Sequence, residues 1–147
     1  MNAAGSLYFA DEGYLTWQKN LVEPYLKQCQ KYAYFHSYDG AAIFYQQYLA
    51  AGADTCIVIS HGFSEFAEKY NEVIYYFLRQ GCSVYILEHR GHGYSEREVS
   101  DDQKVYIRDF EDYIKDLDCF MKKMNYRMER HRILFAHSMG GAVAARY

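Results

Sequence analysis

The chain has 147 residues, of which 50% are hydrophobic and 24% are charged. This balance is typical of one globular domain with a substantial core, so we expect residues 1–147 to form a single domain and not a disordered chain. The net charge of -3 and the pI near 6.0 give no basic surface for nucleic acid, and a small-molecule or lipid partner is expected instead.

Neither a secretory signal nor a membrane span is evident. Residues 1–10 lack a basic region followed by an apolar one, and no later apolar run reaches the roughly 18 residues that a bilayer requires. A cytoplasmic location with at most transient membrane contact is expected. The 17 tyrosines fall mostly at core-facing or half-buried positions, so we interpret them as packing residues.

The first third of the chain predicts a helix followed by a hairpin. The helix is expected over residues 11–31, where Pro24 must mark a break or a new first turn. Residues 32–36 and 43–48 flank the turn signal Asp39-Gly40, which predicts an antiparallel hairpin over residues 32–48.

Residues 55–147 alternate between short apolar runs and amphipathic segments. Strands are predicted over 56–60, 83–87 and 132–136, and helices over 65–80, over 105–124 and from Met139 onward. This order indicates an α/β fold: a mostly parallel sheet with right-handed crossovers, helices on both faces and the antiparallel hairpin at its N-terminal side.

Ser138 lies between the last predicted strand and the helix after it, within Ala-His-Ser-Met-Gly-Gly over residues 136–141. In this position a strained turn exposes a serine hydroxyl above the sheet, so Ser138 is interpreted as a catalytic nucleophile. The Met139 N–H, at the positive end of the new helix, is assigned as one oxyanion donor. Gly140 is expected to let strand and helix approach closely. A structural serine in a tight turn is the alternative.

A second oxyanion donor is expected after the strand at 56–60, where His61, Gly62 and Phe63 follow. The Phe63 N–H is assigned this role, and Gly62 keeps the backbone accessible, with His61 supporting the site. Arg90 and His92 are expected to brace their loop near the site through hydrogen bonds to neighbouring backbone.

Other charged and polar residues are given structural roles. The histidines at 61, 89 and 92 lie on two loops without the spacing of a zinc site, so no metal and no cofactor are predicted. His137 is interpreted as a packing residue, because adjacent side chains at a sharp turn diverge. The aspartates at 109, 112, 116 and 118 are interpreted as a solvated helix face and its N-terminal charges.

Three segments together resemble the lysophospholipase and monoacylglycerol lipase branch of the α/β-hydrolases. They are His-Gly-Phe-Ser-Glu over 61–65, Glu-His-Arg-Gly-His-Gly-Tyr-Ser over 88–95, and the segment 136–141. In that family the middle segment usually begins with aspartate, where this chain has Glu88. The resemblance covers nearly the whole chain. It implies an α/β-hydrolase fold and cleavage of lysophospholipid or monoacylglycerol esters through an acyl-serine intermediate.

The catalytic acid and histidine of α/β-hydrolases follow the serine along the chain. Residues 139–147 contain no Asp, Glu or His. We therefore expect the N-terminal part of such a hydrolase, truncated after the nucleophile turn and without ester turnover of its own. The open edge of the last strand is expected to promote self-association.

Two other functions remain open at this point. The chain could belong to another hydrolase on the same fold, such as a carboxylesterase or an aminopeptidase. It could also be a non-catalytic remnant or interaction module that recruits a partner along the exposed strand edge.

Overall fold

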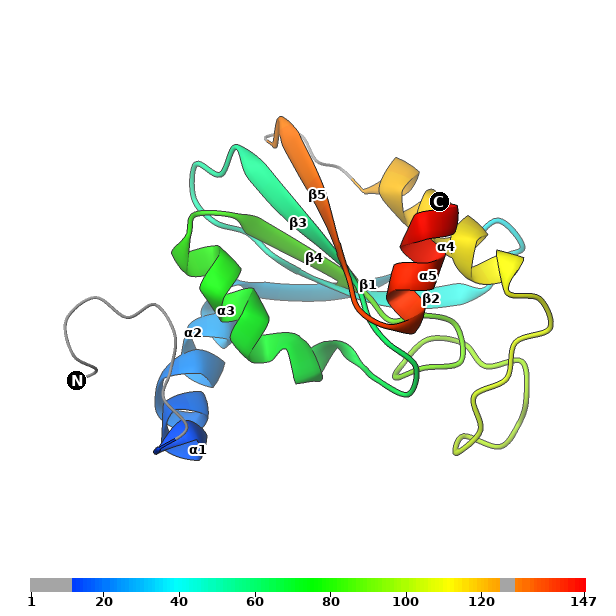
Figure 1. Cartoon of the computed structure of the whole chain (residues 1–147), viewed down its shortest axis with the longest axis horizontal. Coiled ribbons are helices and arrows are strands. Elements are labelled where there is room, and N and C mark those ends of the chain that lie inside the picture. Colours follow the sequence, from blue (N-terminus) through cyan, green and yellow to red (C-terminus); the bar gives the residue numbers. More distant parts are fainter. Residues whose placement is uncertain (1–11, 125–128) are drawn as a thin grey trace.

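A computed structural model describes residues 12–124 and 129–147 (Figure 1). The elements in chain order are α1 (Tyr14–Trp17), the π-helix η1 (Gln18–Val22), α2 (Glu23–Cys29), β1 (Gln30–His36), β2 (Ala42–Tyr48), β3 (Thr55–Ser60), the 3-10 helix η2 (Ala67–Tyr70), α3 (Asn71–Arg79), β4 (Ser83–Leu87), α4 (Glu111–Lys123), β5 (His131–Ala136) and α5 (Met139–Arg146).

The strands form one open, mixed sheet in the order β1-β2-β4-β3-β5. β3 pairs in parallel with both β4 and β5, whereas β2 is antiparallel to β1 and to β4. The predicted α/β architecture, with parallel βα units and an N-terminal antiparallel hairpin, is confirmed.

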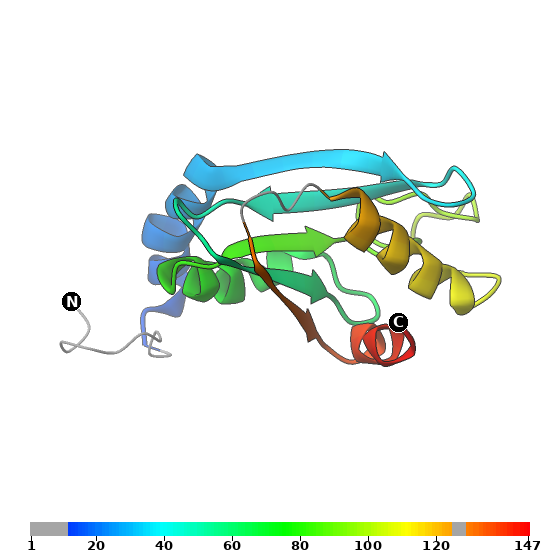
Figure 2. The ribbon, with the colours of Figure 1, turned by 90° about the horizontal axis from the view of Figure 1, so that it is seen from above.

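Alternating side chains divide the sheet between two cores. On β3, Cys56 and Val58 point into the core beneath α4 and α5, whereas Ile57 and Ile59 point into the core beneath α2 and α3. A strand buried on both faces needs this continuous apolar sequence. Figures 1 and 2 show α2 beside α3 and α4 beside α5, so the expectation of helices on both faces is confirmed.

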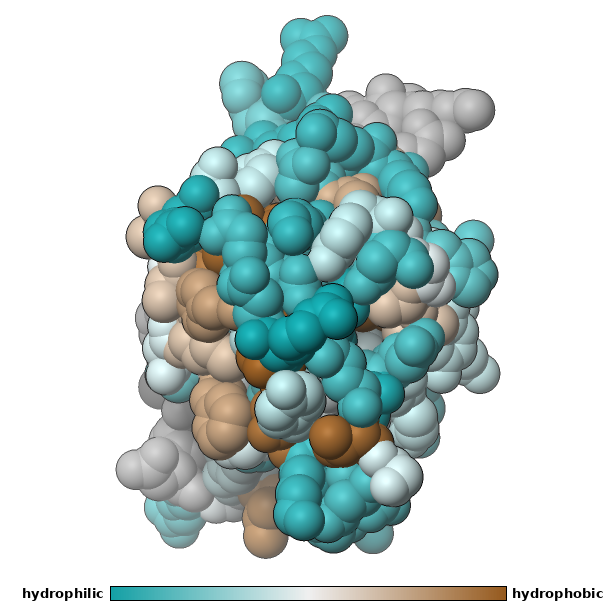
Figure 3. Space-filling view, turned by 90° about the vertical axis from the view of Figure 1, so that its right-hand side faces the viewer, coloured by the Kyte–Doolittle hydropathy of each residue, from teal (hydrophilic) through white to brown (hydrophobic). Residues whose placement is uncertain are grey.

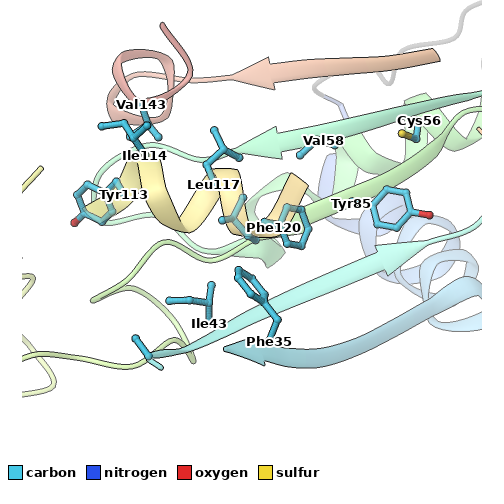
Figure 4. Close-up of a cluster of buried hydrophobic side chains, with 12 residues drawn as sticks. Phe35, Ile43, Cys56, Val58, Tyr85, Tyr113, Ile114, Leu117, Phe120 and Val143 are labelled. Carbon is cyan, nitrogen blue, oxygen red and sulfur yellow. The ribbon is translucent and has the colours of Figure 1, made fainter. Parts of the chain in front are cut away.

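α4 contributes the largest apolar face to its core. Tyr113, Leu117 and Phe120 of this helix belong to one core cluster, and Val143 of α5 lies beside Ile114 (Figure 4). Their spacing of three and four residues places them along one stripe of the helix.

The helix over 105–124 was expected to begin earlier than α4 does. The Asp109 carboxylate accepts the Glu111 N–H at 3.0 Å, and the Asp109 carbonyl accepts the Asp112 N–H. These bonds satisfy N–H groups that have no partner within the first helical turn, so α4 begins at Glu111.

Two other helices also differ from the sequence-based expectation. The helix expected over 11–31 is interrupted by η1, and Pro24 lies in the first turn of α2, which follows η1. The chain is already extended at Gln30, so the helical part ends earlier than expected. Residue 11 lies outside the described residues. Because proline has no N–H, it cannot donate the backbone hydrogen bond that continues an α-helix, which accounts for the break. The helix expected over 65–80 begins only at Ala67, as η2, and α3 ends before Gly81, whose φ is +78°.

β5 lies at one edge of the sheet and, among the described strands, pairs only with β3. Its side chains are poorly covered: Ile133 is 52% exposed and Phe135 is 36% exposed.

No helix within the described ranges is long and apolar enough to cross a bilayer. On the face toward which α4 and α5 lie, hydrophilic residues predominate and apolar residues form separate small areas (Figure 3).

Truncating Leu117 to alanine tests the importance of the α4 core. Leu117 is fully buried, so Leu117→Ala is expected to lower the free energy of unfolding by about 2–5 kcal/mol through lost burial and the cavity left behind. Leu15→Ala is the matched control, because Leu15 is 80% exposed and its loss should change stability by about 0.5 kcal/mol or less. Urea unfolding followed by circular dichroism measures both, and equal effects would contradict this packing.

A charge on β5 tests whether its edge causes association. The chain is expected to form oligomers at micromolar concentration, because the unpaired N–H and C=O groups of an edge strand can bind another strand. Ile133→Lys should shift light scattering toward the monomer, whereas Leu15→Lys, on α1 and away from β5, should not. A wild-type chain that is monodisperse and monomeric would rule this association out.

Candidate active site

The parallel strands bring three loops to one edge of the sheet. Ser60, the last residue of β3, is in register with Leu87 at the end of β4 and with Ala136 at the end of β5. The segments that follow these strands therefore begin side by side, at the edge where open α/β sheets bind ligands. The structure thus brings the predicted nucleophile together with both of the loops singled out in the sequence.

The turn at Ser138 is strained and exposed. Its φ is 52° and its ψ is -119°, a combination that costs a non-glycine residue about 1–3 kcal/mol. Helix α5 begins at the next residue, and the Ser138 carbonyl accepts the N–H groups of Gly141 and Ala142 at 2.9 and 3.2 Å. The hydroxyl thus lies at the apex of a strand-turn-helix unit, in contact with solvent.

Gly140 packs directly against the end of β3. A Cβ atom at this position would lie 2.1 Å from the Ser60 carbonyl oxygen and 2.6 Å from that of His61, so only glycine fits. The Ser60 carbonyl also accepts the His137 N–H at 3.1 Å, and the Ser60 hydroxyl donates to the Gly140 carbonyl at 3.2 Å. These contacts hold the Ser138 turn against the residue that precedes the His61-Gly62-Phe63 segment.

The two N–H groups assigned to an oxyanion are available. Within the described part of the chain, neither the Phe63 N–H nor the Met139 N–H donates a hydrogen bond to another residue. Phe63 is exposed and Met139 is half-buried.

Glu65 fastens the loop after β3 to the Ser138 turn. Its Oε2 atom accepts the Gly62 N–H at 2.7 Å and the Tyr70 hydroxyl at 2.6 Å, and lies 3.3 Å from His137 Nδ1. Burial opposes ionisation here, but these hydrogen bonds prevail and hold the pKa of Glu65 below its usual value. The interpretation of His137 as a packing residue is wrong, because its ring is exposed and faces Glu65.

Three buried histidines lie beneath the site. His61 Nε2 accepts the His89 N–H at 2.9 Å, so the His61 proton resides on Nδ1, which donates to the Gly62 carbonyl at 2.8 Å. His89 Nε2 is 2.8 Å from the Ser60 hydroxyl, and the His61 and His92 ring centroids are 5.2 Å apart. Among the described residues, no group of three His, Cys, Asp or Glu side chains could hold a metal ion.

Burial keeps these three histidines neutral. It lowers the pKa of His61 to about 4 and lowers the pKa values of His89 and His92 below the usual value as well. Two of their ring nitrogens, Nδ1 of His89 and Nε2 of His92, are buried without a hydrogen-bond partner in the described residues. A proton on any of these rings would therefore be poorly solvated.

Arg90 is held by side chains and not by neighbouring backbone, which corrects the sequence-based expectation. Its Nη1 atom donates to Asp39 at 2.7 Å, and its Nη2 and Nε atoms donate to Asp116 at 2.7 and 3.1 Å. His92 follows the expectation, because its Nδ1 atom lies 3.1 Å from the Arg90 carbonyl. Arg90 thus ties the loop after β4 to the β1–β2 turn and to α4.

The interpretation of the α4 aspartates as a solvated face is wrong for two of them. Asp116 and Asp112 are buried, and they accept the hydroxyls of Ser37 and Tyr38, each at 2.5 Å. These partners, together with Arg90, satisfy carboxylates that burial would otherwise destabilise.

Glu88 links the loops after β3 and β4. Its Oε1 atom accepts the Ala67 N–H at 2.9 Å and its Oε2 atom accepts the Tyr94 N–H at 2.6 Å. Gly93, with a φ of +48°, passes so close that a Cβ atom would lie 1.9 Å from Oε2. Burial raises the pKa of Glu88 above its usual value.

Because the three buried histidines are neutral in the folded chain, the stability of the fold is expected to decrease at low pH. Below about pH 6.5 the unfolded chain binds protons on these three histidines and the folded chain resists doing so, so the free energy of unfolding should fall as the pH falls from about 6.5 to 4. Each histidine contributes a slope of at most about 1.4 kcal/mol per pH unit. Urea unfolding at several pH values measures this slope.

Two histidine variants separate the buried groups from the exposed ones. His92→Gln removes one buried titrating ring and should make the slope shallower, whereas His131→Gln changes an exposed ring and should leave it unaltered. An identical slope in both variants would show that the buried histidines are not its origin.

Residues 51–147 match the family model described as serine aminopeptidase, S33. The chain is 34% identical over 113 residues to lysophospholipase L2 of Escherichia coli, a match that covers 76% of this chain and 33% of that protein. It is also 34% identical over 92 residues to the monoacylglycerol lipase of Mycolicibacterium smegmatis, covering 62% of this chain and 31% of that protein. The chain thus spans about a third of the length of these relatives.

Solved structures show the same fold. The Pyrococcus furiosus esterase Pf2001 is 27% identical with a TM-score of 0.64, and the match covers 80% of this chain and 45% of the esterase. An alpha/beta hydrolase from Novosphingobium aromaticivorans is 18% identical with a TM-score of 0.61, covering 78% of this chain and 38% of that protein. The predicted α/β-hydrolase fold is confirmed.

Proposed function

Because this chain belongs to the serine aminopeptidase S33 family of α/β-hydrolases, we propose that Ser138 is the nucleophile of an ester hydrolase. The observation that carries the proposal is the strained turn at Ser138, held by Gly140 against the strand that leads into His61-Gly62-Phe63. A serine hydroxyl exposed at such a turn, with unpaired main-chain N–H groups nearby, is what acyl transfer requires.

In the proposed reaction the Ser138 oxygen attacks the ester carbonyl carbon while its proton passes to a general base, which later gives it to the leaving alcohol. The N–H groups of Phe63 and Met139 donate to the oxyanion as the tetrahedral intermediate forms. Its collapse breaks the bond to the alcohol, which leaves with a proton, and water then hydrolyses the acyl-serine. The base and the acid follow the serine in this family. In the described part of the chain no histidine bonds the Ser138 hydroxyl, and the adjacent ring of His137 faces Glu65.

The proposed substrates are lysophospholipids or monoacylglycerols. The names of the relatives from E. coli and M. smegmatis support this class of lipid ester. The description of the matching family supports an aminopeptidase as the second candidate. The exposed edge of β5 supports a third candidate, a non-catalytic module that binds a partner strand.

A chimeric enzyme tests the nucleophile. Residues 51–147 replace the matching segment of E. coli lysophospholipase L2, so that the remainder of that protein supplies the acid and the histidine. We expect a fluorophosphonate probe to label the chimera, and Ser138→Ala to abolish labelling and lower lysophospholipid turnover by roughly four to six orders of magnitude. Ser100→Ala, which changes an exposed loop serine, is the matched control and should retain both properties.

Two further measurements complete this test. The 147-residue chain alone is expected to hydrolyse a p-nitrophenyl ester no faster than its Ser138→Ala variant, because no base contacts the hydroxyl. Monoacylglycerol and an aminoacyl p-nitroanilide, given to chimera that has not been treated with the probe, distinguish the lipase from the aminopeptidase. A chimera that folds by circular dichroism but is not labelled would refute the assignment of Ser138.

A further inference from the structure

The outer face of the β1–β2 hairpin carries a cluster of exposed aromatic rings, which corrects the interpretation of all tyrosines as packing residues. Tyr32, Tyr34 and Tyr94 are 70%, 53% and 65% exposed. All three rings surround Phe44, with centroid distances of 5.9, 5.3 and 5.2 Å, and the Phe44 ring itself is buried. Three large rings are thus held on a fourth and are largely exposed to solvent.

These rings line a cavity of about 450 Å³ on the side of the sheet that α2 and α3 cover only in part. Such a volume is in the range of small-ligand sites. The other lining residues are Gln30, Gln46 and Glu68, and Glu68 lies on η2, directly after the loop that contains the predicted oxyanion donor. Residues from the hairpin, from η2 and from the loop after β4 therefore converge on one hollow.

The charge of this cavity is negative. Glu68 is the only formally charged residue among those that line it. Its carboxylate forms no hydrogen bond or ion pair with another residue in the described part of the chain. The neighbouring Lys69 forms no ion pair with Glu68 in the described part of the chain, and its Nζ atom lies over the Phe66 ring, 5.5 Å from the centroid.

Aromatic faces and an unpaired carboxylate select the same class of ligand. The face of each ring carries partial negative charge and attracts a cation within about 6 Å. An anion would be repelled by Glu68, and an aliphatic ligand would remove the carboxylate from water without giving it a partner. A cation without N–H groups loses little hydration when it enters an aromatic site, which is why such sites bind quaternary ammonium groups.

We propose that the cavity formed by Tyr32, Tyr34, Phe44, Tyr94 and Glu68 binds a trimethylammonium group, as in choline. The ligand is either a free cation or the head group of a choline lipid. The proposal does not require Ser138 to be reactive, so the two assignments stand or fall separately.

Binding to the 147-residue chain tests this site by nuclear magnetic resonance titration. We expect choline to bind at least about fivefold more tightly than 3,3-dimethyl-1-butanol, its neutral isostere, because only the cation gains from the rings and from Glu68. The chemical shift changes should map to the hairpin and η2. Equal affinities for the two ligands, or shift changes elsewhere in the chain, would overturn the proposal.

Surface variants identify the groups responsible. Glu68→Gln should weaken choline binding about fivefold or more, and Tyr32→Leu or Tyr94→Leu about two- to fivefold each. Glu111→Gln and Tyr106→Leu are matched controls on exposed residues away from the cavity and should leave the affinity unchanged. Wild-type affinity in Glu68→Gln would overturn the proposal even if choline binds.

Glycerophosphocholine distinguishes the two sources of the ligand. This water-soluble head group should bind at least as tightly as choline if the site recognises a lipid. It should bind more weakly if the site recognises the free cation, because Glu68 repels the phosphate. If neither compound binds, the proposal is wrong.

Discussion

The contact between Gly140 and the Ser60 carbonyl positions the whole edge of the sheet that carries the site. Because no side chain fits between them, α5 begins directly against the end of β3, and the turn before it is forced into the strained conformation of Ser138. The parallel pairing of β3 with β5 sets the direction of this contact. The same carbonyl also accepts the His137 N–H, so one backbone oxygen anchors both sides of the turn.

Polar contacts beneath the loops complete this arrangement. Glu65 joins the loop after β3 to the turn, Glu88 joins that loop to the loop after β4, and Arg90 joins the latter to the hairpin and to α4. Each of these charged groups bonds residues from at least two segments. Buried charges of this kind require their partners, and losing one leaves the other uncompensated in a medium that solvates it poorly.

The local patterns in the sequence were sufficient for the order of elements and for the placement of Ser138, because apolar periodicity and glycine positions depend on neighbouring residues. The partners of Arg90 could not be predicted in this way: Asp39 lies in the hairpin turn and Asp116 lies on α4, and only the packed fold brings them together. Asp112 and Asp116 of α4 were interpreted as solvated for the same reason, because their partners Tyr38 and Ser37 are distant in the sequence and reach them only in the packed fold. The exposed rings on the hairpin were missed because the face of an edge strand is set by which helices cover it, which alternation alone does not reveal.

The Glu88 side chain spans the distance between the loops after β3 and β4. Glutamate reaches two backbone N–H groups, one on each loop, while Gly93 passes against its carboxylate. Aspartate would be one methylene shorter and could keep both bonds only if the loops moved closer together. The spacing of these two loops is therefore linked to the length of one side chain, and a change at position 88 should be accompanied by a change in the backbone around it.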